Sequence, residues 1–228
     1  MAAVITVASC GNAKREETDS ANAAKLLMQG VKGCYVELFS DNTLLGEKWD
    51  SLWTTECAKY VGEESAQATA ALLKSSMNGN LTGEAATEMF GDGSDGWKNG
   101  FQFNCHFHNG IEKFIFDGKG QISGTGHDGT TIFSHRYTFS GYDAELDFYI
   151  FKSEDGNKDE FAYFALRPDT PAETHHIEFR YGTDAASLIK FCTGKYAYWM
   201  AAGVLDGKES EQAESIRLFV EENAGQQQ

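Results

Sequence analysis

The sequence has few basic residues: 19 lysines and arginines stand against 34 aspartates and glutamates, which gives a formal net charge of −15. A chain of this charge repels the phosphates of nucleic acids and of acidic lipids, and no basic cluster offsets the repulsion. The composition therefore excludes nucleic-acid binding. Only two prolines accompany 24 glycines, so we expect the turns of the chain to be made mainly with glycine.

Long apolar runs and closely spaced cysteines are also lacking. No stretch reaches the ~20 apolar residues that a membrane-spanning helix needs. The chain has five cysteines, but none forms a Cys-x-x-Cys pair, so a zinc knuckle built from thiolates is not expected. In an exported protein, disulfides could form among Cys34, Cys57, Cys105 and Cys192, and their pairing is left open.

The N-terminus has features of an export signal. Residues 1–10 run from an apolar stretch into small residues, and Val7-Ala8-Ser9-Cys10 resembles a bacterial lipobox, in which the cysteine is lipidated. Residues 11–18 are polar and charged, which is typical of a linker between an anchor and a domain. We therefore predict an exported lipoprotein, anchored to the membrane through Cys10, in the periplasm or on the surface of a bacterium. The alternative is an ordinary apolar start with a buried cysteine.

The rest of the chain divides into helical and β segments. Residues 19–30, 63–77 and 210–222 have the composition and end signals of helices. Between residues 100 and 182, short alternating runs separated by glycine turns predict antiparallel strands joined by hairpins. The aromatic content of 13% suits a β core. These patterns favour a mainly β fold with flanking helices, in which the strands close into a small antiparallel barrel.

Two segments resemble motifs of enzymes or calcium loops, but the neighbouring residues do not fit those motifs. Residues 124–129 (Gly-Thr-Gly-His-Asp-Gly) have the dinucleotide-binding spacing, but a strand pattern follows where a helix is required. The run from Asp155 to Asp159 begins like a calcium loop, yet Glu160 stands where that loop needs glycine, so a hairpin tip explains it better. The sequence therefore predicts that the protein is not an enzyme.

The histidines are the remaining candidates for a functional site. His176 and Glu178 lie two residues apart in a strictly alternating run, so their side chains share one face of a strand. His106 and His108 are related in the same way. Because zinc takes three or four nitrogen, oxygen or sulfur ligands, and strands of a barrel can bring two such pairs together, we predict a metal site. Its first ligands are His176 and Glu178, with His106 and His108 as auxiliary ligands; a solvated polar face is the alternative for each pair.

Several short segments follow one another in an order that is typical of one family; they are residues 49–53 (Trp-Asp-Ser-Leu-Trp), 137–142 (Tyr-Thr-Phe-Ser-Gly-Tyr), 160–164, 176–184, 187–188 and 196–198. Together they resemble the ZinT/YodA family of bacterial zinc-binding proteins. The resemblance implies a calycin-like barrel, related to lipocalins, with helices at one end. This domain would span residues 19–224 and leave residues 225–228 as a tail. It also implies zinc as the bound ion and a metal-uptake transporter as a partner.

One position departs from the family pattern. The resemblance implies three zinc-binding histidines, one of them nine residues before a His-x-His pair. Carried over by position, they fall on Arg167, His176 and Glu178. Arg167 cannot ligate a metal, because its guanidinium stays protonated. Two interpretations are open. In the first, His106 or His108 joins His176 and Glu178 and completes the metal site. In the second, metal binding is lost, and Arg167 forms a buried ion pair with Glu178 or contacts an anion.

The sequence as a whole predicts a cell-envelope lipoprotein that binds a divalent metal ion, zinc first, as a carrier or scavenger. The alternative is a calycin-like barrel with a vestigial metal site, which binds a small organic ligand or a partner protein.

Overall fold

The computed structural model describes residues 9–77, 106–190 and 201–225. In chain order its elements are α1 (Ser9–Gly30), β1 (Gly33–Glu37), the short 3₁₀ helix η1 (Glu47–Trp49), α2 (Asp50–Val61), α3 (Glu63–Met77), β2 (Lys113–Phe116), β3 (Gln121–Thr125), β4 (Thr131–Asp143), β5 (Phe148–Ser153), β6 (Tyr163–Leu166), β7 (Ile177–Gly182), α6 (Ala185–Lys190), β8 (Ala201–Leu205) and α7 (Glu209–Ala224).

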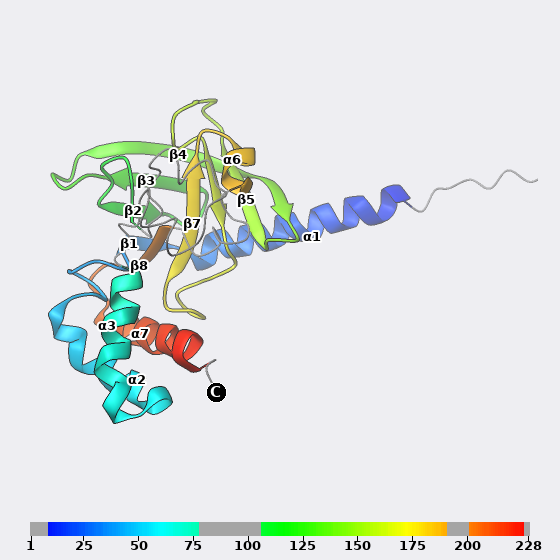
Figure 1. The fold of residues 1–228 in the computed structure, drawn as a ribbon. Coiled ribbons are helices and arrows are strands. Elements are labelled where there is room, and N and C mark those ends of the chain that lie inside the picture. The colour runs from blue at the N-terminus through cyan, green and yellow to red at the C-terminus, as the bar shows by residue number, and fades with distance from the viewer. Residues whose placement is uncertain (1–8, 78–105, 191–200, 226–228) are drawn as a thin grey trace, which may run out of the picture.

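The strands β1 to β8 form one closed antiparallel barrel in sequence order, and β8 pairs with β1 to complete it. Helices α2, α3 and α7 gather beside one end of the barrel, while the N-terminal half of α1 projects away from it (Figure 1). The predicted fold, a mainly β calycin-like barrel with N-terminal and C-terminal helices, is therefore confirmed.

Aromatic rings fill the interior of the barrel. Along β7, Ile177 and Phe179 are buried in the barrel core, and Tyr181 packs against it. The ring of Phe179 lies 6.0 Å from that of Phe164, in a stacked arrangement, and 5.0 Å from that of Phe114, edge to face. Such pairs stabilise the barrel beyond the burial of their apolar area. Because side chains alternate along a strand, the residues of β7 that lie between Ile177, Phe179 and Tyr181 face outward.

The last turns of α1 close one end of the barrel. Ala24, Leu27 and Met28 belong to the barrel core, and the hydroxyl of Tyr35 donates a hydrogen bond to the carbonyl of Val31 at 2.8 Å. The helix also includes residues 11–18, the stretch that the sequence assigned to a linker. Despite its polarity, this stretch consists largely of good helix formers. The role of these residues as a linker stays a prediction.

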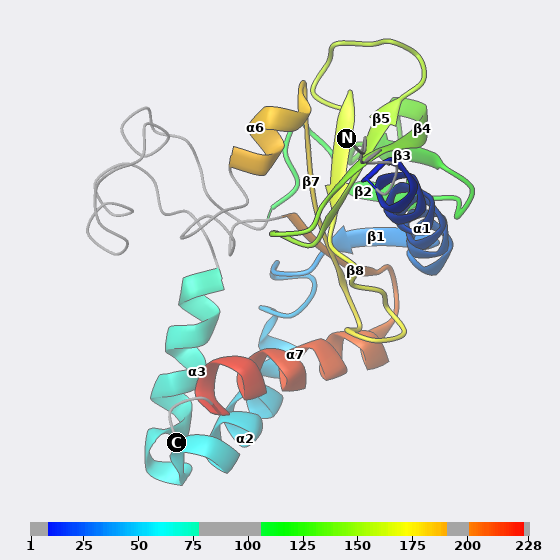
Figure 2. The same ribbon diagram turned by 90° about the vertical axis from the view of Figure 1, so that its right-hand side faces the viewer.

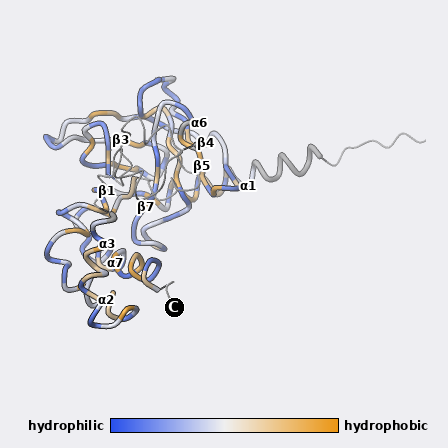
Figure 3. The backbone as a smooth tube through the Cα atoms, viewed as in Figure 1, coloured by the Kyte–Doolittle hydropathy of each residue, from blue (hydrophilic) through white to orange (hydrophobic). Residues whose placement is uncertain are grey.

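A second core joins the helices to the outer face of β1 and β8. Val36, Ala202 and Val204 point away from the barrel interior and pack with residues of α2, α3 and α7. Trp53 is fully buried there, and its indole N–H donates to the carbonyl of Leu44 at 2.8 Å. Figure 2 shows α7 running beneath the strands, and Figure 3 shows apolar residues both in the barrel and among these helices. This packing brings α7 close to the outer face of β7, the neighbour of β8.

The strand boundaries differ from the prediction in three places. β4 continues through residues 140–143, although the Ser-Gly-Tyr-Asp run there fits the glycine turns predicted between the strands, and a register shift between Phe139 and Gly141 accommodates the extra residue. His106 and His108, which were predicted to share one face of a strand, lie instead in a loop that precedes β2, and residues 101–105 lie outside the described part. β1 and β8, which close the barrel, had no strand prediction.

Cys34 and Cys57 are free thiols. Cys105, Cys192 and the side chain of Cys10 lie outside the described residues. Within the described part of the chain, no helix has both the length and the apolar character to cross a membrane.

Replacing Phe179 with alanine tests the barrel core. Its side chain is fully buried, so Phe179→Ala should lower the free energy of unfolding by about 3–5 kcal/mol, measured by urea titration of the circular dichroism signal. The matched control is Leu72→Ala on α3, whose side chain is 66% exposed and which should change stability little. Equal effects of the two substitutions would contradict the packing described.

Candidate metal centre

The outward face of β7 carries the predicted ligand pair. Because Ile177 and Phe179 point into the barrel core, His176 and Glu178 point outward, as the alternation predicts. Glu178 pairs across the sheet with Ala202, which packs against the helical layer. The pair therefore lies on the outer surface of the barrel, beside α7, and not in the barrel interior.

His176 is held in one orientation by the backbone. Its Nδ1 atom lies 2.7 Å from the carbonyl oxygen of Thr174, and because a carbonyl only accepts, Nδ1 must carry the proton. The neutral ring then has its lone pair on Nε2, which lies 3.8 Å from Oε1 of Glu178. Burial alone would lower the pKa of His176, but the nearby charge of Glu178, together with the Thr174 carbonyl and Asp169, raises the pKa above its usual value.

Arg167 lies directly beside this pair. Its backbone N–H donates to the carbonyl of Glu178 at 3.1 Å, so the two side chains share the outward face. Its Nε atom lies 3.9 Å from Oε2 of Glu178 and 3.6 Å from Oδ2 of Asp169. The three positions that the family resemblance identifies therefore do come together, with a guanidinium in place of the first imidazole.

Two further carboxylates interact electrostatically with this cluster. Burial, followed by the charge of Glu178, raises the pKa of Asp169. Burial also raises the pKa of Glu222 on α7, and Glu178 adds to the effect, while His176 and Arg167 oppose it. Raised pKa values of neighbouring carboxyls reflect burial and an excess of negative charge, which a bound cation would relieve.

Sequence reasoning missed both Asp169 and Glu222. Asp169 belongs to a loop without periodicity, and Glu222 is one of many acidic residues on the last helix. Only the packing of α7 against the barrel brings Glu222 near the cluster. No local signal in the sequence could have identified it.

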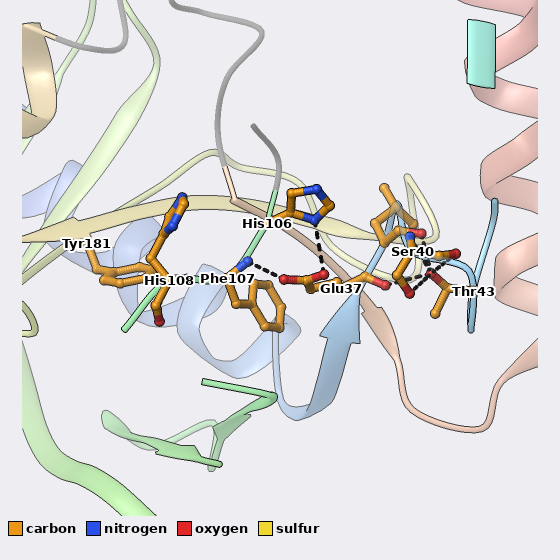
Figure 4. Close-up of polar contacts among 8 residues, drawn as sticks. Glu37, Ser40, Thr43, His106, Phe107, His108 and Tyr181 are labelled. Carbon is orange, nitrogen blue, oxygen red and sulfur yellow. Dashed lines mark hydrogen bonds and ion pairs between the residues drawn. The ribbon is translucent and has the colours of Figure 1, made fainter. Parts of the chain in front are cut away.

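The auxiliary pair, His106 and His108, lies beside Glu37 of β1 and Tyr181 of β7 (Figure 4). There Oε2 of Glu37 lies 3.1 Å from Nδ1 of His106, and Oε1 accepts the backbone N–H of Phe107 at 2.6 Å. The backbone N–H of His108 donates to the hydroxyl of Tyr181 at 2.6 Å. Phe107, between the two histidines, is buried in the barrel core, so this loop is fastened to β1 and β7. The hydrogen bond that His106 donates to the Glu37 carboxylate raises the pKa of His106. Burial and the charge of His106 lower the pKa of His108.

These side chains do not form a complete set of ligands as they stand. Across residues 9–77, 106–190 and 201–225, no three histidine, cysteine, aspartate or glutamate side chains are close enough to hold one ion. His106 contacts Glu37, and His176 contacts Glu178. The combined set of four ligands therefore stays a prediction.

The other histidines contact separate carboxylates. His175 contacts Glu211 of α7 at 2.8 Å, and the exposed His127 contacts Glu112 at 3.1 Å. His135 lies between two aspartates of the hairpin tip at residues 155–159.

Comparison with known proteins finds resemblance at the level of structure. No family model matches the chain, and no curated protein matches it. The zinc-bound ZinT-like domain of Streptococcus pneumoniae AdcA is similar, with a TM-score of 0.47 and 11% identity, over 85% of this chain and 89% of that domain. Zinc-bound AdcA from the same organism is similar with a TM-score of 0.44 and 9% identity, over 82% of this chain and 34% of the AdcA chain. The sequence motifs resemble the same family, but likeness at this level says nothing of the side chains at the site.

Proposed function

We propose that this protein binds a divalent metal ion, zinc first, between His176 and Glu178, as a carrier or scavenger in the cell envelope. The orientation of His176 is the observation that carries the proposal. The Thr174 carbonyl holds Nδ1–H, so Nε2 presents its lone pair toward a carboxylate oxygen 3.8 Å away. A backbone carbonyl behind the ring is the usual support of a metal-binding histidine. Two ligands of one tetrahedral zinc ion lie about 3.4 Å apart, so a small side-chain movement would bring both onto the ion.

Asp169 and Glu222 are further acidic residues whose charges interact with the pair, and Asp169 is the better placed because its carboxylate also lies 3.6 Å from Arg167. A divalent ion would offset the negative charge that raises the pKa values of these carboxyls. His106 and His108 remain auxiliary candidates. Binding and transfer of the ion need no catalytic group, so we propose no enzymatic activity.

The aromatic filling of the barrel bears on the alternative function. Phe114, Phe116, Phe164 and Phe179 are almost completely buried and contact one another across the interior. Their rings take up the space that an organic ligand would occupy in a calycin-like barrel. A small organic ligand inside the barrel is therefore less well supported than a metal ion on its outer face.

Zinc titration by calorimetry on chelator-stripped protein tests the site. Wild-type protein should bind one zinc ion, and His176→Ala should weaken binding by at least about 100-fold, because even groups that only orient a ligand are worth ~10–100-fold. His127→Ala is the matched control, since the side chain of His127 is 88% exposed and lies outside the cluster. Zinc binding of equal strength in His176→Ala would refute the proposal.

The affinity for zinc should depend on pH in a defined direction. A metal-bound imidazole must be deprotonated, and the pKa of His176 is raised, so protons compete with zinc at pH values above the ordinary histidine pKa of ~6.5. Below the pKa of His176, the affinity should fall about tenfold for each pH unit. Calorimetry in buffers of different ionisation enthalpy measures the proton that zinc releases. An affinity independent of pH would exclude His176 as a ligand.

We further propose that Cys10 carries the lipid anchor and that the projecting part of α1 holds the barrel away from the membrane. In a bacterial host that processes lipoproteins, the precursor expressed with its complete export signal should give a mature protein that begins at acylated Cys10, as shown by mass spectrometry. Cys10→Ser should abolish both the acyl mass and recovery in the membrane fraction. Cys34→Ser, which changes a cysteine of β1, should leave both unchanged. A protein that starts upstream of Cys10 without a lipid would contradict this assignment.

A further inference from the structure

We propose that Arg167 is an internal counter-cation of the metal site: its guanidinium neutralises Asp169 and Glu178, and an incoming metal ion displaces it. The inference rests on the proposed function, because it concerns the same site. It assigns a regulatory role to the residue that departs from the family pattern.

The position of Arg167 supports this role. The hydrogen bond between its backbone N–H and the Glu178 carbonyl fixes it beside the ligand pair. Its Nε atom is 3.6 Å from Asp169 and 3.9 Å from Glu178, so the positive charge lies between two carboxylates. A guanidinium keeps its charge at every physiological pH, so it offsets negative charge at the place where a metal ion would do so.

Charge alone attracts Arg167 to these carboxylates, because neither distance is within hydrogen-bonding range. The Nε atom is buried and has no hydrogen-bond partner among the described residues. A structural arginine–carboxylate pair would normally form two parallel hydrogen bonds of fixed geometry. Arg167 is therefore not locked in place by its partners.

The guanidinium also lies against an aromatic ring. Its central carbon is 5.8 Å from the ring centroid of Phe148, a distance at which a cation is attracted to the face of the ring. The side chain of Arg167 is 38% exposed, so the guanidinium can move toward solvent. Displacement therefore does not leave a buried, unpaired charge.

This arrangement makes the metal compete with a tethered cation. Affinity should be lower than in a site with a neutral residue at position 167, and release should be favoured because the guanidinium returns to the carboxylates. Both effects suit a protein that must give up its ion to a partner.

Calorimetric titration of Arg167→Gln with zinc tests the inference. The variant keeps a polar side chain of similar length but removes the charge, so it should bind zinc at least about tenfold more tightly, since a charge within ~4–6 Å is worth one to three units of pKa. Arg167→Lys keeps the charge and should bind nearly as wild type does. Arg136→Gln, on the exposed face of β4, is the matched control. An unchanged or lower affinity in Arg167→Gln would overturn the inference.

A measurement on wild-type protein covers the case in which the variant does not fold. The ¹H–¹⁵N signal of the Arg167 Nε–H, assigned by comparison with Arg167→Lys, should shift on addition of zinc and return on addition of chelator. A signal that zinc does not affect would overturn the inference.

Different results would refute the two proposals. Zinc binding that is unchanged in His176→Ala would refute the proposed site, whereas zinc binding that needs His176 but is unchanged in Arg167→Gln would refute only the role of Arg167 as counter-cation. If Arg167→Gln binds zinc through His176 and wild type does not, the counter-cation is supported and wild-type carriage is refuted.

Discussion

The burial of Phe179 at the centre of the barrel determines where the polar residues of β7 point. Side chains alternate along a strand, so an aromatic ring packed against Phe114 and Phe164 on the inside requires Glu178 and His176 on the outside. A shift of one residue would expose the ring and bury the carboxylate, at a cost that no surface contact could offset. The hydrophobic core thus sets the geometry of the charged cluster.

The outer face of β7 acquires its chemistry from what packs around it. The backbone pairing of Arg167 with Glu178 comes from the antiparallel register of β6 and β7. Glu222 comes from α7, which is held against the barrel by the apolar contacts of Ala202 and Val204 with the helical core. Two carboxylates, one guanidinium and one imidazole then share a region that is partly shielded from water, where each charge affects the others more strongly than in solvent, and the exposed Glu222 interacts with them from α7.

Sequence reasoning recovered the parts of the structure that repeat with a regular period. The alternation around β7 and the helical pattern of α7 both predicted the observed element, because burial on one face imposes a period on the residues. Sequence reasoning failed where a strand or a site residue depends on contacts between residues that are far apart in the sequence. β1 and β8 are short and contain small residues, and they become strands because they pair with each other to close the barrel. Glu222 could not be associated with His176 for the same reason.

The distribution of charge bears on whether the proposed metal site is in use or has decayed. A lone ion pair between Arg167 and Glu178 would need one carboxylate, yet Asp169 and Glu222 are also present and have raised pKa values. Each raised pKa means that folding makes ionisation less favourable, so these acids reduce the stability of the protein at neutral pH. Arg167 and His176 offset only part of that cost. A cation that binds the folded protein would offset the rest, and this unbalanced charge is the physical reason for preferring the metal-binding function.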